Sequence, residues 1–132
     1  APFEKPMRLL TSVPGIGVTT AATLMVELDD VVRFKNADHL ASFIGLVPMC
    51  HSSGESNGTG DITVRRHFML RSLLVEAAWI AIRKDPAMTV AYTEYRKRMN
   101  PQKSIIKIAR RLVNRIYYVL KHEKEYIPCV VK

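Results

Sequence analysis

The chain has 132 residues, of which 48% are hydrophobic and 24% are charged, which fits one globular domain with its own core. Its net charge of +8 and its pI of about 9.8 favour a polyanionic partner, most simply nucleic acid. The charge is uneven: residues 1–82 carry seven Lys/Arg and eight Asp/Glu, whereas residues 83–132 carry thirteen and four. A basic surface kept for solubility is the alternative.

Cys50 and Cys129 lie far apart and follow no metal-binding or redox spacing, so we expect free thiols in a reducing cytoplasm. No apolar run approaches the roughly 18 residues that a membrane span requires, and no signal peptide is visible. The chain lacks an initiating methionine and begins close to a predicted helix. We therefore interpret it as a fragment of a longer protein.

Residues 7–28 predict two helices joined by a tight turn. Pro14 stops the first helix, and the second begins with an apolar helical pattern after Gly17. Gly15 and Gly17 permit positive φ and let another backbone come close, and we expect Ile16 between them to point inward. Either of two threonines, Thr19 and Thr20, is a candidate cap of the second helix.

This turn resembles the helix-hairpin-helix motif, in which backbone N–H groups of a P-G-I-G sequence contact a DNA phosphate. The unpaired N–H groups and the positive dipole end of any helix N-terminus attract anions in this way. An ordinary turn between packed helices, or a hairpin that contacts only protein, is the alternative. The candidate DNA-binding residues of the hairpin are Pro14, Gly15, Ile16, Gly17 and Thr19.

Residues 37–44 predict a third helix, which Asn36 caps and Gly45 terminates, preceded by a connector anchored by Phe34. Residues 45–63 form the only long segment too rich in Gly, Ser and Asn for a helix, and such a connection inside a compact helical domain is usually functional or disordered. We expect it to be a loop that carries Ser52 and Ser53.

Residues 64–84 predict a long central helix capped by Thr63. Its expected apolar face consists of Phe68, Leu70, Leu73, Leu74, Ala77, Ala78, Ile80 and Ala81. Three arginines, Arg65, Arg66 and Arg71, lie near its start, where cations are mildly unfavourable, so an anion that needs them is one explanation. Three exposed arginines without a ligand are the other.

Residues 87–99 and 104–123 predict two more helices, separated by Asn100-Pro101, and residues 124–132 show no clear element. The last helix carries a basic stripe that could follow a phosphate backbone or simply face solvent. Its members are Lys103, Lys107, Arg110, Arg111 and Arg115. Tyr117, Tyr118 and Tyr126 could stack on bases, although packing against the protein is the better interpretation. The fold class is therefore an all-α, compact single domain over residues 1–132.

The order of several segments resembles the C-terminal domain of bacterial insertion-sequence transposases of the IS-one-ten type. The matching pieces cover nearly the whole chain and are, in order, LLTSVPGIG, RFKNADHLASFIGLVP, SSG, GDIT, LRSLLVEAAW and KIARRLVNRIYYVL. In that family an N-terminal nuclease-like domain with a DEDD carboxylate set precedes the helical domain. The resemblance therefore implies a DNA-binding and catalytic domain, with the nuclease-like domain absent from this chain.

The resemblance also implies the chemistry. The family uses a serine before a glycine as a DNA nucleophile, and the matching residue is Ser53, with Ser52 as the adjacent alternative. Arginines near an attacked phosphate stabilise its developing charge, which gives Arg65, Arg66 and Arg71 as candidates. It implies DNA and a structured guide RNA as partners, no cofactor in this domain, Mg²⁺ in the absent domain, an oligomer of the full-length protein, and a nucleoid-associated location in the bacterial cytoplasm.

One departure from the family pattern lies between the IT dipeptide and the LR pair. Relatives commonly have Lys-x-Gly-Asn there, whereas this chain has Arg66-His67 in place of Gly-Asn. Cys50, His51 and His67 make a weak zinc set, so we expect no metal site. Two other functions remain open: a non-catalytic helix-hairpin-helix nucleic-acid-binding module, and a protein-interaction domain whose basic helices bind acidic partners.

Overall fold

The computed structural model describes residues 4–46 and 61–127, with side chains described for residues 4–46 and 68–127. Within these ranges the chain forms helices and no strands, which confirms the all-α prediction. The elements are α1 (Glu4–Thr11), α2 (Val18–Leu28), the 3₁₀ turn η1 (Val31–Arg33), α3 (Ala37–Ile44), α4 (Asp61–Lys84), α5 (Pro86–Arg96) and α6 (Pro101–His122).

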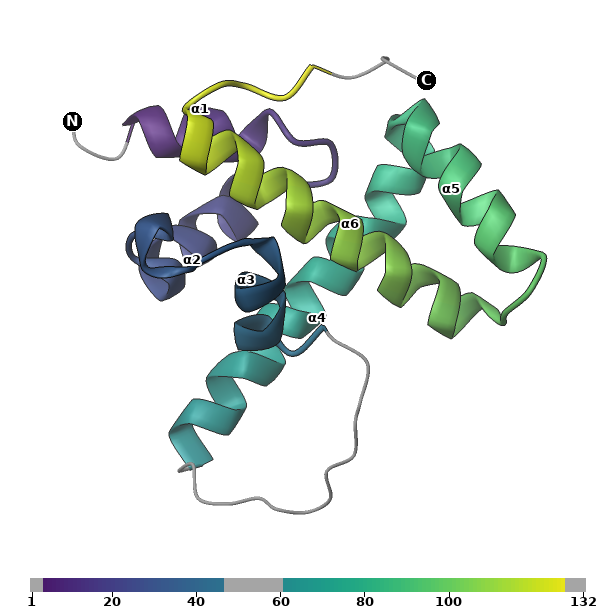
Figure 1. The fold of residues 1–132 in the computed structure, drawn as a ribbon, viewed down its shortest axis with the longest axis horizontal. Coiled ribbons are helices and arrows are strands. Elements are labelled where there is room, and N and C mark those ends of the chain that lie inside the picture. Colours follow the sequence, from purple (N-terminus) through teal and green to yellow (C-terminus); the bar gives the residue numbers. More distant parts are fainter. Residues whose placement is uncertain (1–3, 47–60, 128–132) are drawn as a thin grey trace.

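The two longest helices, α4 and α6, cross at the centre of the molecule (Figure 1). The hairpin of α1 and α2 packs at one end, α5 packs against both long helices at the other, and α3 lies between them. Apolar residues of α4 and α6 recur at helical spacing and are fully buried where the two helices meet. The principal ones are Leu70, Leu74, Ala78, Ile108, Leu112, Val113 and Ile116. Each buried Leu or Ile contributes about 1.5–3 kcal/mol relative to exposure.

Side-chain caps begin three of the helices. Asn36 accepts a hydrogen bond from the backbone N–H of His39 at 2.8 Å, Asp85 accepts one from Ala87 at 3.1 Å, and Asn100 accepts one from Lys103 at 2.8 Å. A cap of this kind stabilises its helix by about 1 kcal/mol. The predicted cap at Asn36 is confirmed, and the two X-Pro breaks at Asp85 and Asn100 place Pro at the first helical position.

Glycine ends α3 as predicted. Gly45 has φ of +92°, the left-handed conformation that only glycine adopts freely, and its N–H returns to the carbonyl oxygens of Ala41 and Ser42. The predicted serine loop begins here, but residues 47–60, with Ser52 and Ser53, lie outside the described residues. Since α4 already begins at Asp61, Thr63 lies inside the helix and the prediction of Thr63 as its cap is wrong.

Of the predicted apolar face of α4, Leu70, Leu74, Ala77, Ala78 and Ala81 are buried, whereas Leu73 and Ile80 are only half-buried and Phe68 is exposed. Phe68 was expected in the core, yet 66% of it is exposed, and Met69 beside it is 47% exposed. The first turns of α4 extend beyond the other helices (Figure 1), so no neighbour covers Phe68 there among the described residues. Helical spacing identifies the apolar stripe but does not show how far along the helix the packing partners reach.

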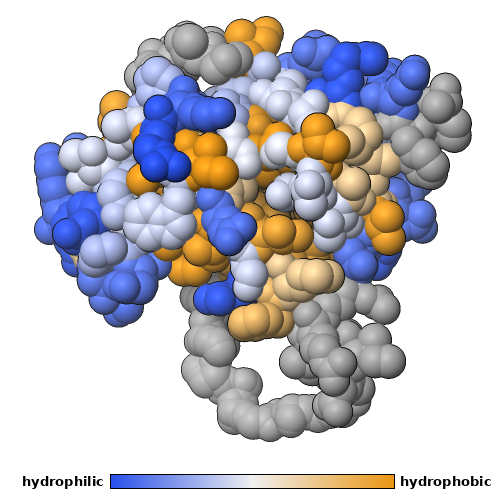
Figure 2. All heavy atoms as spheres, turned by 180° about the vertical axis from the view of Figure 1, so that it is seen from behind, coloured by the Kyte–Doolittle hydropathy of each residue, from blue (hydrophilic) through white to orange (hydrophobic). Residues whose placement is uncertain are grey.

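The surface seen from behind shows apolar side chains between hydrophilic groups that gather towards its sides (Figure 2). Exposed apolar residues of the molecule include Val26 and Val32 as well as Phe68. Single exposed apolar residues of this kind are ordinary for a folded domain. In the described part of the chain, no helix combines the length and the hydropathy that crossing a bilayer demands.

Candidate nucleic-acid interface

The turn between α1 and α2 is held from inside by apolar side chains. Val13 is fully buried and Ile16 is 4% exposed, as predicted for Ile16, while the N–H of Ile16 bonds to the carbonyl oxygen of Val13 at 3.0 Å. Pro14 lies between them and is half-buried. The hydrophobic anchors fix the turn, so its backbone geometry does not depend on a ligand.

Gly15 is the position at which another backbone comes close. Its φ is +97°, and a Cβ atom built on it would lie 2.4 Å from the carbonyl oxygen of Ala77 in α4. Both the backbone conformation and the available space therefore require glycine. This part of the sequence prediction is confirmed, and it shows that Gly15 serves the packing of the hairpin on α4.

Gly17 has a different role from the one predicted. Its φ is −89°, it is exposed, and no atom lies within 4 Å of a Cβ built on it. It is the N-cap of α2 and makes no side-chain cap hydrogen bond, so the prediction that Thr19 or Thr20 caps this helix is wrong. Of the two glycines that permit positive φ, only Gly15 adopts it.

The first turn of α2 has no side-chain cap from its N-cap residue. The first N–H groups of an α-helix have no acceptor within the helix, and Gly17 has no side chain that could supply one. Val18 is 68% exposed and Thr19 is exposed, so solvent reaches this helix end. The arrangement suits an anion, because these donors and the positive end of the helix dipole point the same way.

The five predicted cations of α6 are not equivalent in the structure. Lys103 and Lys107 are exposed near the start of the helix. Arg110 forms an ion pair with Asp38 of α3, and Arg111 donates from Nε to the hydroxyl oxygen of Tyr95 at 3.0 Å. The stripe therefore contains two open lysines followed by arginines that also hold neighbouring helices.

Arg115 is the last member of the stripe and lies against the C-terminal part of the chain. The centre of its guanidinium group is 5.0 Å from the centroid of the Tyr126 ring, a cation–π contact. Its Nε atom is shielded from solvent and has no hydrogen-bond acceptor in the described parts of the chain. Arg110 Nε is in the same condition.

Most of the candidate catalytic residues lie outside the part of the chain that the structure describes. Ser52 and Ser53 lie outside the described residues, and Arg65 and Arg66 lie in α4 but their side chains are not described. Arg71 is half-buried, and its Cδ atom would be 3.8 Å from a Cβ built on Gly45. Arg71 therefore lies beside the point at which the serine-containing segment leaves α3.

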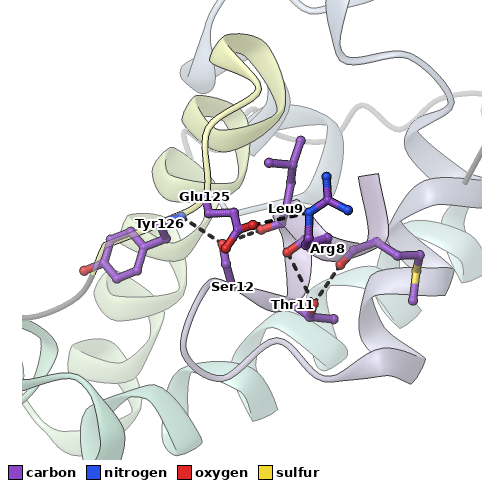
Figure 3. Close-up of polar contacts among 7 residues, drawn as sticks. Arg8, Leu9, Thr11, Ser12, Glu125 and Tyr126 are labelled. Carbon is purple, nitrogen blue, oxygen red and sulfur yellow. Dashed lines mark hydrogen bonds and ion pairs between the residues drawn. The ribbon is translucent and has the colours of Figure 1, made fainter. Parts of the chain in front are cut away.

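Residues 123–127, here called the C-terminal strap, are fastened to α1, although the sequence predicted Glu123 as the end of the last helix and no regular element after it. The N–H of Tyr126 donates to Ser12 Oγ at 2.8 Å, and this hydroxyl donates to the carbonyl oxygen of Leu9 at 2.6 Å (Figure 3). Glu125 pairs with Arg8 at 3.3 Å in the same view. The strap thus crosses the base of the hairpin turn.

A buried carboxylate holds the strap from the other side. Asp85 is fully buried, and its Oδ2 accepts a hydrogen bond from the Tyr126 hydroxyl at 2.7 Å. Burial raises the pKa of Tyr126, Arg115 opposes this change, and Asp85 adds to it. The sequence marked Asp85 only as a break between helices. Tyr126 was predicted only to stack on bases or pack against the protein, and its contact with Asp85 was not predicted, because the two residues are 41 positions apart in the chain.

The described residues contain no group of three or more His, Cys, Asp or Glu side chains that could hold a metal ion. Two acidic residues near the site make other contacts: Asp38 pairs with Arg110, and Asp85 accepts a hydrogen bond from Tyr126. These residues do not fit a Mg²⁺ centre, and no chemical step in this part of the chain is assigned to a metal.

Comparison with known families gives the class of protein, the transposases. Residues 7–93 match the model of the Transposase IS116/IS110/IS902 family, which takes in the hairpin, α3, α4 and most of α5. The chain belongs to this family. The resemblance found in the sequence is thereby confirmed.

Relatives extend the similarity beyond the family match. The chain is 32% identical over 114 residues to the uncharacterized 43.6 kDa protein of insertion element IS110 from Streptomyces coelicolor, covering 86% of this chain and 28% of that protein. It is 39% identical over 72 residues to the transposase of IS1111A from Coxiella burnetii, covering 54% of this chain and 20% of that protein. It is 33% identical over 125 residues to a pilin gene-inverting protein of Moraxella bovis, covering 89% of this chain and 38% of that protein. The chain therefore spans only a minor part of each relative's length.

Proposed function

We propose that this chain is the DNA-binding and catalytic C-terminal domain of an insertion-sequence transposase. Family membership is the observation that carries the proposal, since relatives are named transposases or a gene-inverting protein. The open N-terminus of α2 and the exposed Lys103 and Lys107 support DNA binding, because phosphates take their hydrogen bonds from backbone N–H groups and lysines. Such contacts position DNA without reading its sequence.

Within that function, Ser53 is the proposed nucleophile and Ser52 the alternative. The Ser53 hydroxyl oxygen would attack a DNA phosphorus, forming an Oγ–P bond while the P–O bond to one deoxyribose oxygen breaks. A general base takes the serine proton and the departing oxygen gains one, so the phosphoserine link keeps the bond energy for rejoining. The position of Arg71 beside the start of this segment supports a role in stabilising the charge of the attacked phosphate.

The remaining parts of the reaction lie outside this chain. A nuclease-like domain would supply the carboxylates, Mg²⁺ and the general base, and a structured guide RNA would join the complex. Bringing several DNA ends together requires an oligomer of the full-length protein. The chain by itself is therefore expected to bind nucleic acid and to cut nothing.

The test is the Ser53→Ala variant of the full-length protein. Strand exchange should disappear while DNA binding remains, and wild-type protein mixed with DNA should give a covalent protein–DNA adduct after denaturation. Ser52→Ala is the matched control and should keep both activities. A Ser53→Ala protein that still recombines DNA would show that the nucleophile is elsewhere.

A non-catalytic helix-hairpin-helix module is the second candidate, and the open helix end at Gly17 favours it. In that case the hairpin would be the main binding site and no covalent adduct would form with any variant. Trapping the adduct therefore separates the two functions. The dependence of duplex binding on salt concentration tests the hairpin and α6 in either case.

A further inference from the structure

A groove of about 450 Å³ lies between the C-terminal half of α6 and the strap, a size within the roughly 300–1,000 Å³ of ordinary ligand sites. Its lining includes Arg115 and Tyr118 from α6 and Lys124, Tyr126 and Ile127 from the strap. Neither the family match, which ends at residue 93, nor the hairpin includes this surface. The groove is lined by both cationic and aromatic side chains.

The floor of the groove is rigid. Tyr126 is fixed at its hydroxyl by buried Asp85 and at its backbone by Ser12, and Arg115 lies against its ring. A site that is already ordered binds a ligand without losing further conformational freedom. The groove would therefore keep its shape when empty.

The walls of the groove offer the two kinds of contact that an unpaired nucleic-acid strand uses. Tyr118 is 50% exposed and presents an aromatic surface, and Lys124 is exposed. Arg115 is half-buried and adds a positive charge to the lining of the groove, although its Nε atom is itself shielded from solvent. Glu125 also lines the groove, but its carboxylate is paired with Arg8.

We propose that this groove binds an unpaired strand of nucleic acid, with a base stacked on Tyr118 and the adjoining phosphate bound by exposed Lys124 in the positive field of Arg115. Base faces are covered in a duplex and become available only when the strand is open, so an aromatic groove selects single strands. The inference rests on the proposed function, because it takes nucleic acid as the partner. It adds a second site, for strands opened during the reaction.

The test uses the 132-residue chain and three labelled probes: a short oligothymidylate, an oligouridylate and a hairpin duplex, each measured by fluorescence anisotropy. Tyr118→Ala should weaken oligothymidylate binding roughly tenfold, as expected for the loss of one stacked base, and leave duplex binding unchanged. Tyr118→Phe keeps the aromatic ring and should bind oligothymidylate as the wild type does. Comparison of oligothymidylate with oligouridylate shows whether DNA or RNA is the natural strand.

A second pair of variants tests the contribution of lysine charge to single-strand binding. Lys124→Ala should weaken single-strand binding and reduce its salt dependence, whereas Lys97→Ala, which removes an equal charge at the C-terminal end of α5, at the opposite end of α6 from the groove, should do neither. Both lysines are exposed, so both variants are expected to fold, and circular dichroism checks this. Single-strand binding that Tyr118→Ala and Lys124→Ala leave intact would overturn the proposal, as would equal losses for single strand and duplex. Failure of the wild-type chain to bind duplex would instead count against the proposed function.

Discussion

Gly15 and Ala77 lie so close together that a Cβ atom at position 15 would be 2.4 Å from the Ala77 carbonyl oxygen. This contact seats the hairpin on the central helix and thereby sets the direction in which the N-terminus of α2 points. The two glycines of the turn therefore have different roles. Gly15 allows the hairpin to pack on α4, and Gly17 leaves the N-terminus of α2 without a side-chain cap.

Replacing Gly15 with alanine should therefore destabilise the domain. The substitution combines a strained positive φ with an overlap against backbone that cannot move aside, and we expect the free energy of unfolding to fall by about 2–4 kcal/mol. Gly17→Ala is the control, because its φ is negative and its surroundings are empty, and it should lose less than about 1 kcal/mol. Urea unfolding followed by circular dichroism measures both, and equal losses would refute the assignment of the close contact to Gly15.

Tyr126 should make stability depend on alkaline pH. Its pKa in the folded state is raised above the ordinary 10.0, so the folded protein favours the neutral phenol. The corresponding stabilisation is fully present below pH 10 and is lost as the pH rises through the folded-state pKa. Unfolding curves of the wild type and Tyr126→Phe, measured across this range, should converge as the pH increases.

Comparing the wild type with Tyr126→Phe at neutral pH tests the hydrogen bond between Tyr126 and Asp85 separately from the pKa. Tyr126→Phe leaves the Asp85 Oδ2 without its donor, and an unsatisfied buried oxygen costs about 1–3 kcal/mol. A difference between the two proteins that stays constant from neutral to strongly alkaline pH would contradict the pKa argument while leaving the hydrogen bond itself in place.

Asp38 is expected to restrain DNA binding, because it pairs with Arg110 in the basic stripe. Its side chain is 79% exposed, so the pair contributes less than about 1 kcal/mol to stability. Asp38→Asn should release Arg110, tighten duplex binding and steepen the slope of log K against log salt by about 0.9. Glu76→Gln changes the net charge equally at an exposed site on α4, so an identical effect from that variant would refute a specific role for Arg110.

Local sequence signals predicted much of this fold because they act over a few residues. Apolar spacing gave the helices, and Asn36 and Gly45 marked the ends of α3 through hydrogen bonds within one turn. The errors lie where distant segments decide. Phe68 fits the apolar stripe of α4 but extends past its neighbours, and Gly17 is free of the packing that constrains Gly15.

The candidate site was predictable to a smaller extent. The hairpin was located from its own four residues, whereas the partners of Arg110, Arg111 and Arg115 come from other elements and could not be read from the period of α6. The groove depends on a contact between Asp85 and Tyr126 that no local sequence pattern predicts. The basic and aromatic residues that line it were noted in the sequence, but the sequence did not show that they lie together.

The strap joins the first described helix to the last. Lys5 bonds to Glu123 and Ser12 to Tyr126, pairs that are 118 and 114 positions apart in the chain. During synthesis on the ribosome, α1 would emerge long before the residues that fasten it. The hairpin would therefore complete its seating only after nearly the whole chain had left the exit tunnel, which makes closure of the domain a late event in its biogenesis.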